Sequence, residues 1–132
     1  MTQLLSSEEE RIGKEIVNAS FIVHKALGPG LLEKVYEVCL SHELRKAGLN
    51  VDRQIDIPIV YDGITFEEGL RLDLLVNSKV IIELKAVDFI LTDFEVQLMN
   101  YLKSTNLPLG FLINFGPRRV EIRRRVNLIN QR

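Results

Sequence analysis

The chain has 132 residues, of which 46% are hydrophobic and 27% charged, and its formal net charge is −1. This length suits one domain with its own core, and a near-neutral charge gives no overall attraction to nucleic acid. No apolar run is long enough to cross a bilayer, and the acidic start is unlike a signal peptide, so no membrane association is expected. The single cysteine, Cys39, allows no internal disulfide and favours a reducing cytoplasm.

The first two expected elements are helices. Ser7 and Glu10 have the spacing of a capping box, and apolar residues repeat at helical intervals after them, which predicts a helix over about 8–27. The Gly-Pro-Gly stretch at 28–30 ends that helix, and a second helix is expected over about 31–47.

Glu33 lies in the first turn of the second expected helix. It extends the apolar stripe of Tyr36, Leu40 and Leu44, where a carboxylate is out of pattern. An acid in a first turn also interacts favourably with the helix dipole. The stripe alone therefore leaves open whether Glu33 has a structural or a chemical role.

The middle of the chain has the alternation of β-strands. Residues 51–61 alternate isoleucine with other residues and predict a strand, and Asp62-Gly63 after it is a turn signal. A short stretch over 64–69 then leads into a hairpin over 70–87, in which aliphatic residues alternate with charges on both arms.

The alternation indicates the register of this hairpin. If 77–79 form the loop and Val76 faces Val80, Asp73 lies opposite Glu83, and Lys85 follows on the same face. The other face is then wholly apolar. A slip of one residue would mix apolar and charged side chains, which a half-buried sheet resists. The predicted apolar face includes Leu70, Leu72, Leu74, Ile82 and Leu84.

Two facing acids are costly in a sheet. Opposed Cβ atoms are about 5 Å apart, and two unit charges at that distance repel by roughly 3 kcal/mol at an effective dielectric of about 20. A divalent metal, or a raised pKa on one acid, removes this conflict. The alternative is a solvated face on which Asp73 and Glu83 splay apart, and the hairpin alone does not choose between them.

A third helix and two strands are expected next. Thr92 with Glu95 is a second capping box and predicts a helix that ends near residue 105. Gln97 borders its apolar face, where a solvated glutamine is the ordinary interpretation. Residues 109–115 form an apolar run typical of a buried strand, and residues 120–126 have the pattern of a last strand.

The end of the chain is rich in arginine. Residues 118–132 hold six arginines and one glutamate. Arginines on a last strand protect an exposed edge from aggregation, and the same cluster suits contact with the phosphates of nucleic acid. The candidates for that contact are Arg118, Arg119, Arg123, Arg124 and Arg125.

The expected order is two helices, three strands, a helix and two strands. With several short motifs, it resembles the GxxExxY proteins, a small-domain branch of the PD-(D/E)XK nuclease superfamily. Residues 30–36 match the signature Gly-x-x-Glu-x-x-Tyr. Other similar segments follow in the family's order over roughly 10–125: Val23-His24, Leu27 to Gly30, Leu72 to Val76, Glu83 to Lys85, Gln97-Leu98, Asn100 to Leu102 and Asn114 to Gly116.

The resemblance implies a fold and a chemistry. The fold is α/β (α+β-like), with a restriction-endonuclease-like core in which helices flank a mixed twisted sheet of about 4–5 strands. Asp73 and Glu83 would hold Mg²⁺ or Mn²⁺, and Glu33 would add a third carboxylate ligand or orient the attacking water. Lys85 would stabilise charge on the scissile phosphate, and Gln97 matches a residue often found beside the site in related nucleases.

The predicted function is that of a magnesium-dependent nuclease that hydrolyses phosphodiester bonds in DNA, with RNA as the less favoured substrate. Residues 1–132 are expected to form one nuclease-like domain, with an N-terminal helix over about 8–27, a core over about 31–126 and a short arginine-rich end. The alternative is a catalytically inactive nuclease fold that binds nucleic acid or a protein partner. A homodimer is a further hypothesis, because so small a domain cannot surround much duplex.

Overall fold

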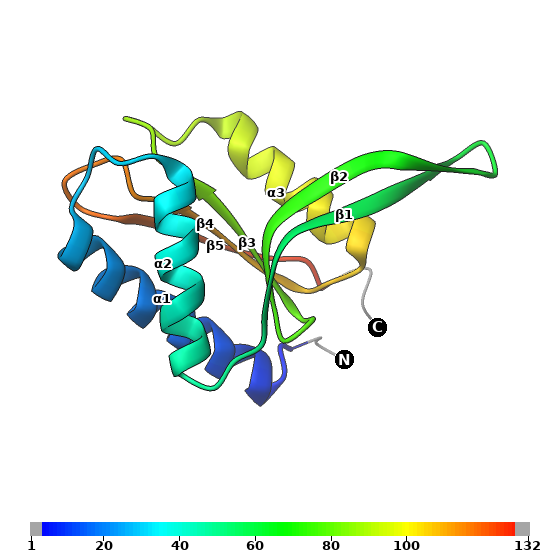
Figure 1. Ribbon diagram of the computed structural model, residues 1–132. Coiled ribbons are helices and arrows are strands. Elements are labelled where there is room, and N and C mark those ends of the chain that lie inside the picture. The colour runs from blue at the N-terminus through cyan, green and yellow to red at the C-terminus, as the bar shows by residue number, and fades with distance from the viewer. Residues whose placement is uncertain (1–3, 129–132) are drawn as a thin grey trace.

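The computed structural model describes residues 4–128, which form three helices and five strands (Figure 1). Their order is the predicted one. Residues 1–3 and 129–132, at the ends of the predicted domain, lie outside the described residues. The elements are α1 (Ser7–Leu27), α2 (Glu33–Lys46), β1 (Val51–Tyr61), β2 (Ile64–Val76), β3 (Val80–Lys85), α3 (Thr92–Thr105), β4 (Leu109–Asn114) and β5 (Glu121–Val126).

The strands of the described residues form one mixed sheet in the order β1-β2-β3-β4-β5. Neighbouring strands are antiparallel except β3 and β4, which run parallel. A parallel pair needs a long crossover connection, and α3 provides it. The predicted mixed sheet flanked by helices is confirmed.

Helices cover both faces of this sheet (Figure 1). α1 and α2 pack on one face, in a core that contains Tyr36, Phe111 and Phe115. α3 packs on the other face through Leu98 and Leu102. Each helix therefore buries the apolar stripe that its sequence predicts. Within residues 4–128, no helix combines the length and the apolar character needed to cross a membrane.

The start of the β2–β3 hairpin has the predicted register. Val76 pairs with Val80 and Leu74 with Ile82, around a loop in which Asn77 has a φ of 51°. The paired backbone ends at Leu74, because β2 then leaves the sheet with β1 as a long two-stranded arm (Figure 1). The two strands of the hairpin thus diverge at the residues that follow this pair.

The divergence corrects one part of the prediction. Leu72 was expected on the same apolar face as Leu74, but it lies in the core beneath α3, with Ile81 and Leu112. Leu74 lies in the core beneath α1 and α2. The simple alternation therefore breaks at Asp73, where β2 leaves the sheet, and a pattern of period two contains no signal of such a break.

The predicted capping boxes also need correction. The N-cap of α1 is Ser6, whose hydroxyl accepts a hydrogen bond from the Glu9 N–H, one residue before the predicted pair. Both pairs have the same spacing, so the pattern did not separate them. α3 begins at Thr92 after the N-cap Leu91, which has no side-chain acceptor, so the second predicted box does not form.

Candidate active site

Two carboxylates meet where β2 and β3 diverge. The Leu84 N–H donates a hydrogen bond to Asp73 Oδ2 at 2.7 Å, and the Asp73 N–H donates to Glu83 Oε1 at 3.3 Å. Each acid thus accepts a backbone hydrogen bond from the opposite strand, in place of continued backbone pairing. The two acids are neighbours as the sequence predicted, but the predicted strand pairing does not extend to them, because it ends at Leu74 and Ile82.

Glu83 of this acidic pair is buried, and Asp73 is half-buried. Glu83 is 4% exposed, and burial, followed by the charge of Asp73, raises the pKa of Glu83 to about 9. Burial also raises the pKa of Asp73, although the hydrogen bond from Leu84 opposes that change. A carboxyl group with a pKa near that of Glu83 keeps its proton at neutral pH, and the proton removes the repulsion within the pair. The metal-free protein thus relieves the conflict by protonation.

Lys85 and Glu33 lie within electrostatic reach of the pair. Lys85 Nζ is 4.4 Å from the centre of the Phe94 ring on α3, a cation–π contact that holds the ammonium beside the sheet. Burial raises the pKa of Glu33, the charge of Asp73 adds to the increase, and the charge of Lys85 opposes it. The first turn of α2 and the ends of two strands therefore converge on one site.

Glu33 does not join the pair as a ready-made third ligand. The described residues contain no group of three or more His, Cys, Asp or Glu side chains arranged to hold a metal ion. Asp73 and Glu83 each have one carboxylate oxygen that makes no backbone hydrogen bond to the facing strand. The carboxylate oxygens of Asp73 and Glu83 are thus the candidate metal ligands at the centre of the site, and Glu33 lies at its edge.

Tyr36 fixes the loop that leads into α2. Its hydroxyl donates to the Gly28 carbonyl oxygen at 2.5 Å and accepts from the Leu31 N–H at 3.2 Å. Its ring stacks on Phe115, with centroids 4.6 Å apart, and the His24 ring also stacks on Phe115. The tyrosine of the Gly-x-x-Glu-x-x-Tyr motif thus holds the start of α2, from which Glu33 projects.

Glu37 is a buried acid that the sequence interpretation missed. It is 5% exposed and lies one turn after Glu33 on α2. The Arg53 Nε and Nη2 atoms both lie 3.0 Å from Glu37 Oε2, and Gln54 Nε2 donates to Oε1 at 2.6 Å. The charge of Glu37 contributes to the raised pKa of Asp73. Its spacing of four residues from Glu33 was the available signal, since these positions share a helix face.

Gln97 lies outside the acidic pair. It is exposed on α3 and lines a cavity of about 440 Å³ together with Leu70 and Tyr101. Within the described part of the chain, Gln97 makes no hydrogen bond to either acid. Burial raises the pKa of Tyr101, and the charges of Glu83 and Asp73 add to this increase. This α3 side chain is therefore within electrostatic reach of the acidic pair.

The candidate arginines fall into two groups. Arg124 pairs with Glu10 of α1, with Nη2 and Oε1 2.7 Å apart, and Arg125 pairs with Glu95 of α3. Both therefore tie the edge strand β5 to the helices. Arg118, Arg119 and Arg123 make no ion pair with any residue in 4–128.

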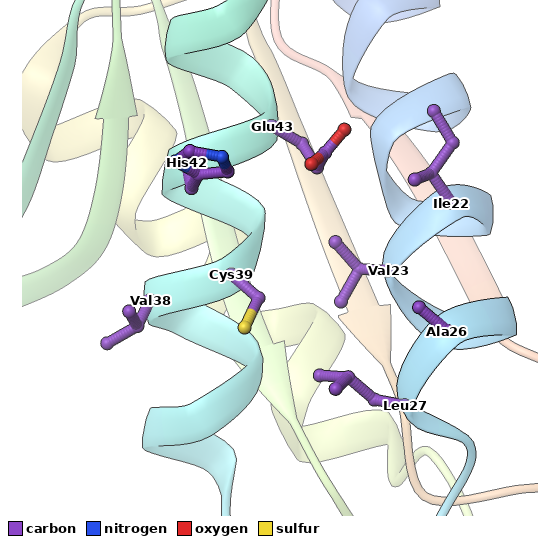
Figure 2. A pocket seen from close by; sticks show the side chains of 8 residues that line it. All are labelled: Ile22, Val23, Ala26, Leu27, Val38, Cys39, His42 and Glu43. Atoms are coloured by element: carbon purple, nitrogen blue, oxygen red, sulfur yellow. The ribbon is translucent and has the colours of Figure 1, made fainter.

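A separate groove lies between α1 and α2. It has a volume of about 450 Å³, and Figure 2 shows Val23, Leu27 and Cys39 pointing into the gap between the two helices. His42 and Glu43 lie at one end. The walls are mainly apolar, and none of the acids at the β2–β3 junction lines it. This groove is therefore distinct from the candidate active site.

The family assignment now follows from both the geometry and the comparison with known proteins. The family model of the PD-(D/E)XK nuclease superfamily matches residues 10–126. The chain belongs to this superfamily, and its five-stranded mixed sheet with three flanking helices is a restriction-endonuclease-like α/β fold.

Comparison of structures gives the same fold. The crystal structure of SSO0001 superposes with a TM-score of 0.59 at 18% sequence identity, over 94% of this chain and 62% of that chain. This chain thus spans less than two thirds of the length of SSO0001, and the likeness concerns the fold alone. No significant match to a curated protein was found.

Proposed function

We propose that the chain is a metal-dependent nuclease that hydrolyses phosphodiester bonds in nucleic acid, with DNA favoured over RNA. The observation that carries this proposal is the pairing of half-buried Asp73 with buried Glu83, with Lys85 two residues further along β3. A protein that only binds nucleic acid has no need to place two facing acids largely out of water, because that arrangement raises the energy of both charges. Membership of a nuclease superfamily supports the same reaction class.

The donor set of the pair fits a hard divalent cation. Asp73 and Glu83 offer carboxylate oxygens, the ligands preferred by Mg²⁺ and Mn²⁺. These two acids would hold the ion, and Glu33 would add a third carboxylate or orient the attacking water. When bound, the ion neutralises negative charge near the phosphate and favours deprotonation of water.

The remaining roles belong to the side chains of the chain itself. Lys85 carries a positive charge beside the pair and would stabilise the charge that develops on the scissile phosphate. Glu33, exposed at the start of α2, suits orientation of the attacking water from the solvent side. Gln97 is exposed on α3 and would contact the substrate beside the scissile bond.

Arginines would supply contacts to phosphates. Arg118, Arg119 and Arg123 are the stronger candidates, because no ion pair to residues 4–128 occupies them. Arg124 and Arg125 would have to exchange their partners Glu10 and Glu95 for phosphate oxygens. All five arginines would contact phosphates, the three without an ion pair to residues 4–128 more readily than Arg124 and Arg125.

We also propose the branch of the superfamily, the cellular compartment and the domain organisation. The match of Glu33 and Tyr36 to the GxxExxY signature, and the role of Tyr36 in holding the α2 loop, support that branch of the superfamily. One cysteine in the whole chain suits a reducing cytoplasm. A single nuclease domain is supported by one sheet that runs from β1 to β5.

We also propose a homodimer, through the face of α1 or the edge strand β5. On α1, Phe21 is 56% and Ile22 53% exposed, which is apolar surface that a partner copy would cover. Light scattering at tens of micromolar protein, with and without duplex DNA, tests this. A monomer mass under both conditions would remove the dimer from the account.

The enzymatic proposal is tested by incubating the purified protein with a fluorescent duplex and magnesium. Metal-dependent cleavage by the parent, lost in Asp73→Asn but kept in the matched exposed-acid control Asp52→Asn, is the expected result. Binding without cleavage would favour the inactive nucleic-acid-binding module. A protein that neither binds nor cleaves would favour a protein-interaction module.

A further inference from the structure

A second cleft adjoins the acidic pair on the side of β1. It has a volume of about 440 Å³ and is lined by Glu33, Lys34, Glu37, Arg53, Gln54 and Arg71. These side chains come from α2, β1 and β2, and three of them are cations. Because Glu33 lines the cleft and lies within electrostatic reach of Asp73, the cleft opens beside the proposed site of cleavage.

Arg53 is held in this cleft by a buried acid. Its Nε and Nη2 atoms each lie 3.0 Å from Glu37 Oε2. The Glu37 side chain is 7% exposed, whereas that of Arg53 is 32% exposed, so the guanidinium bridges the interior and the surface. A carboxylate that fixes one edge of a guanidinium reduces the conformational freedom that the arginine would lose on binding a ligand.

The guanidinium edge of Arg53 that faces away from Glu37 is available to donate hydrogen bonds to a ligand. Among the described residues, its Nη1 atom has no hydrogen-bond partner. A guanidinium has five N–H donors in one plane, so Glu37 leaves several of them for a second acceptor. Phosphate oxygens match this planar arrangement of donors.

Two further cations face the same cleft with little to hold them elsewhere. Arg71 donates to Asp56 at 2.8 Å, but both side chains are more than 60% exposed, and ion pairs of this kind contribute little to stability. Lys34 makes no ion pair with any residue in 4–128. The ammonium group of Lys34 and the guanidinium group of Arg71 can therefore turn toward a ligand at small cost.

The cleft is held against the acidic pair by the backbone. Arg53 pairs with Leu74 and Ile55 with Leu72, and between these two pairs lie Gln54 on β1 and Asp73 on β2. Gln54 has a φ of 53°, an unusual left-handed conformation for a residue with a side chain, and its amide is fixed by Glu37. Glu37 of α2 thus binds the segment of β1 that runs beside Asp73.

We propose that the cleft formed by Lys34, Arg53 and Arg71 binds a backbone phosphate of the nucleic-acid strand that is cleaved at Asp73 and Glu83. The assignment rests on the proposed nuclease function and specifies where the strand runs. The substrate enters along the α2–β1 side of the site, and Arg53 is the central phosphate ligand. The alternative is that Arg53 serves only to neutralise Glu37.

Binding of a labelled duplex, measured over a range of salt concentrations, separates these interpretations. All proteins carry Asp73→Asn, so that binding is measured without the expected cleavage. The first variant is Lys34→Ala with Arg71→Ala, since both side chains are exposed and the fold does not depend on them. The second is Arg53→Gln, which keeps an amide donor for Glu37. Lys46→Ala, at the far end of α2, is the matched control, and a thermal melt checks the folding of each variant.

Both test variants should bind more weakly, and the slope of log affinity against log salt should fall by about 0.9 for each phosphate that the variant no longer neutralises. Lys46→Ala should keep the slope of the Asp73→Asn protein. An unchanged slope in either test variant would overturn the assignment. A parent protein that cleaves duplex with magnesium while these slopes stay unchanged would overturn the cleft alone. A parent that neither binds nor cleaves would overturn the nuclease proposal as well.

Discussion

Two buried glutamates, Glu37 and Glu83, differ in what compensates the loss of water around their carboxyl groups. Glu37 is 5% and Glu83 4% exposed, so each has lost nearly all contact with water. Glu37 accepts hydrogen bonds from a guanidinium and an amide, whereas Glu83 faces a second acid and accepts one backbone hydrogen bond at 3.3 Å. Arg53 neutralises the charge of Glu37, whereas Glu83 makes no such ion pair within residues 4–128 and is neutralised by binding a proton.

This difference in compensation distinguishes an acid that stabilises the fold from one that is suited to bind a cation. A buried carboxylate with complementary donors stabilises its surroundings only while both partners remain. A buried carboxylate beside another acid destabilises the metal-free fold and favours whatever supplies positive charge, either a proton or a metal ion. The comparison therefore predicts that a substitution at Glu37 lowers the free energy of unfolding more than a substitution at Glu83 does.

The largest expected effect is on catalysis at the acidic pair. Asp73→Asn should reduce metal-dependent cleavage by at least about 1,000-fold, because one of the two proposed metal ligands loses its charge. Cleavage rates with a labelled duplex and magnesium measure this. A rate within about 10-fold of the parent would exclude Asp73 from the reaction.

Lys85 should affect turnover but not the metal. Lys85→Ala should slow cleavage by about 100-fold, since the side chain would act on the developing phosphate charge. The magnesium-dependent rise in melting temperature should persist, because the two acids are unchanged. If that rise disappears while the fold survives, Lys85 has a role in metal binding that this mechanism does not give it.

The two glutamates differ in their effect on stability. Glu37→Ala should lower the free energy of unfolding by about 2 kcal/mol, because Arg53 and Gln54 lose a shared acceptor. Glu83→Gln should change it by less than about 1 kcal/mol, or increase it, because the amide oxygen still accepts from the Asp73 N–H. Urea titrations without metal measure both values. Equal losses would remove the contrast between the two acids.

The pH dependence of stability sharpens the same contrast. Since the pKa of Glu83 is raised from 4.5 to about 9, the folded protein binds the proton more tightly than the unfolded chain. Its contribution to stability is complete below about pH 4.5 and is lost as the pH rises toward about 9. The metal-free parent should therefore lose more stability between about pH 6 and 9 than Glu83→Gln does, as thermal melts would measure. Parallel curves would contradict the raised pKa.

The smallest expected effect is at Glu33. Glu33→Gln should weaken magnesium binding less than Asp73→Asn does, because Glu33 does not form a three-acid group with the pair among the described residues. Calorimetric titration with magnesium compares the two variants. If Glu33→Gln abolishes binding, the metal draws Glu33 into its coordination sphere and the third-ligand role is the better one.

The sequence predicted the fold well where periodicity is regular. The helix stripes and the register from Val76–Val80 to Leu74–Ile82 are confirmed, because each depends on side chains that alternate between core and surface. Leu72 was assigned to the wrong face, since the divergence of the two strands at Asp73 depends on tertiary contacts of the β1–β2 arm. The Ser6 cap was missed by one residue because two equivalent boxes overlap.

The candidate site was predictable only in part. The proximity of Asp73 and Glu83 could be predicted from the local hairpin pattern, although the strand pairing itself ends one pair earlier, at Leu74 and Ile82. The network of Glu37 with Arg53 and Gln54 joins α2 to a strand 16 residues further on, and no local pattern indicates which buried acid meets which cation. The ion pairs of Arg124 and Arg125 with α1 and α3 likewise bring together distant segments, so the arginine run looked uniform in the sequence.

The most direct test of the central claim is a thermal melt of the parent and Asp73→Asn, each with and without magnesium. The substituted amide retains an oxygen acceptor for the Leu84 N–H and removes the cost of holding the Asp73 charge largely out of water, so the metal-free variant should be as stable as the parent or more so. Magnesium at about 100 times its dissociation constant should stabilise the parent by about 2.7 kcal/mol and leave the variant unchanged. A metal-free variant destabilised by several kcal/mol, or equal stabilisation of both proteins by magnesium, would contradict the claim that this acidic pair is held together for a cation.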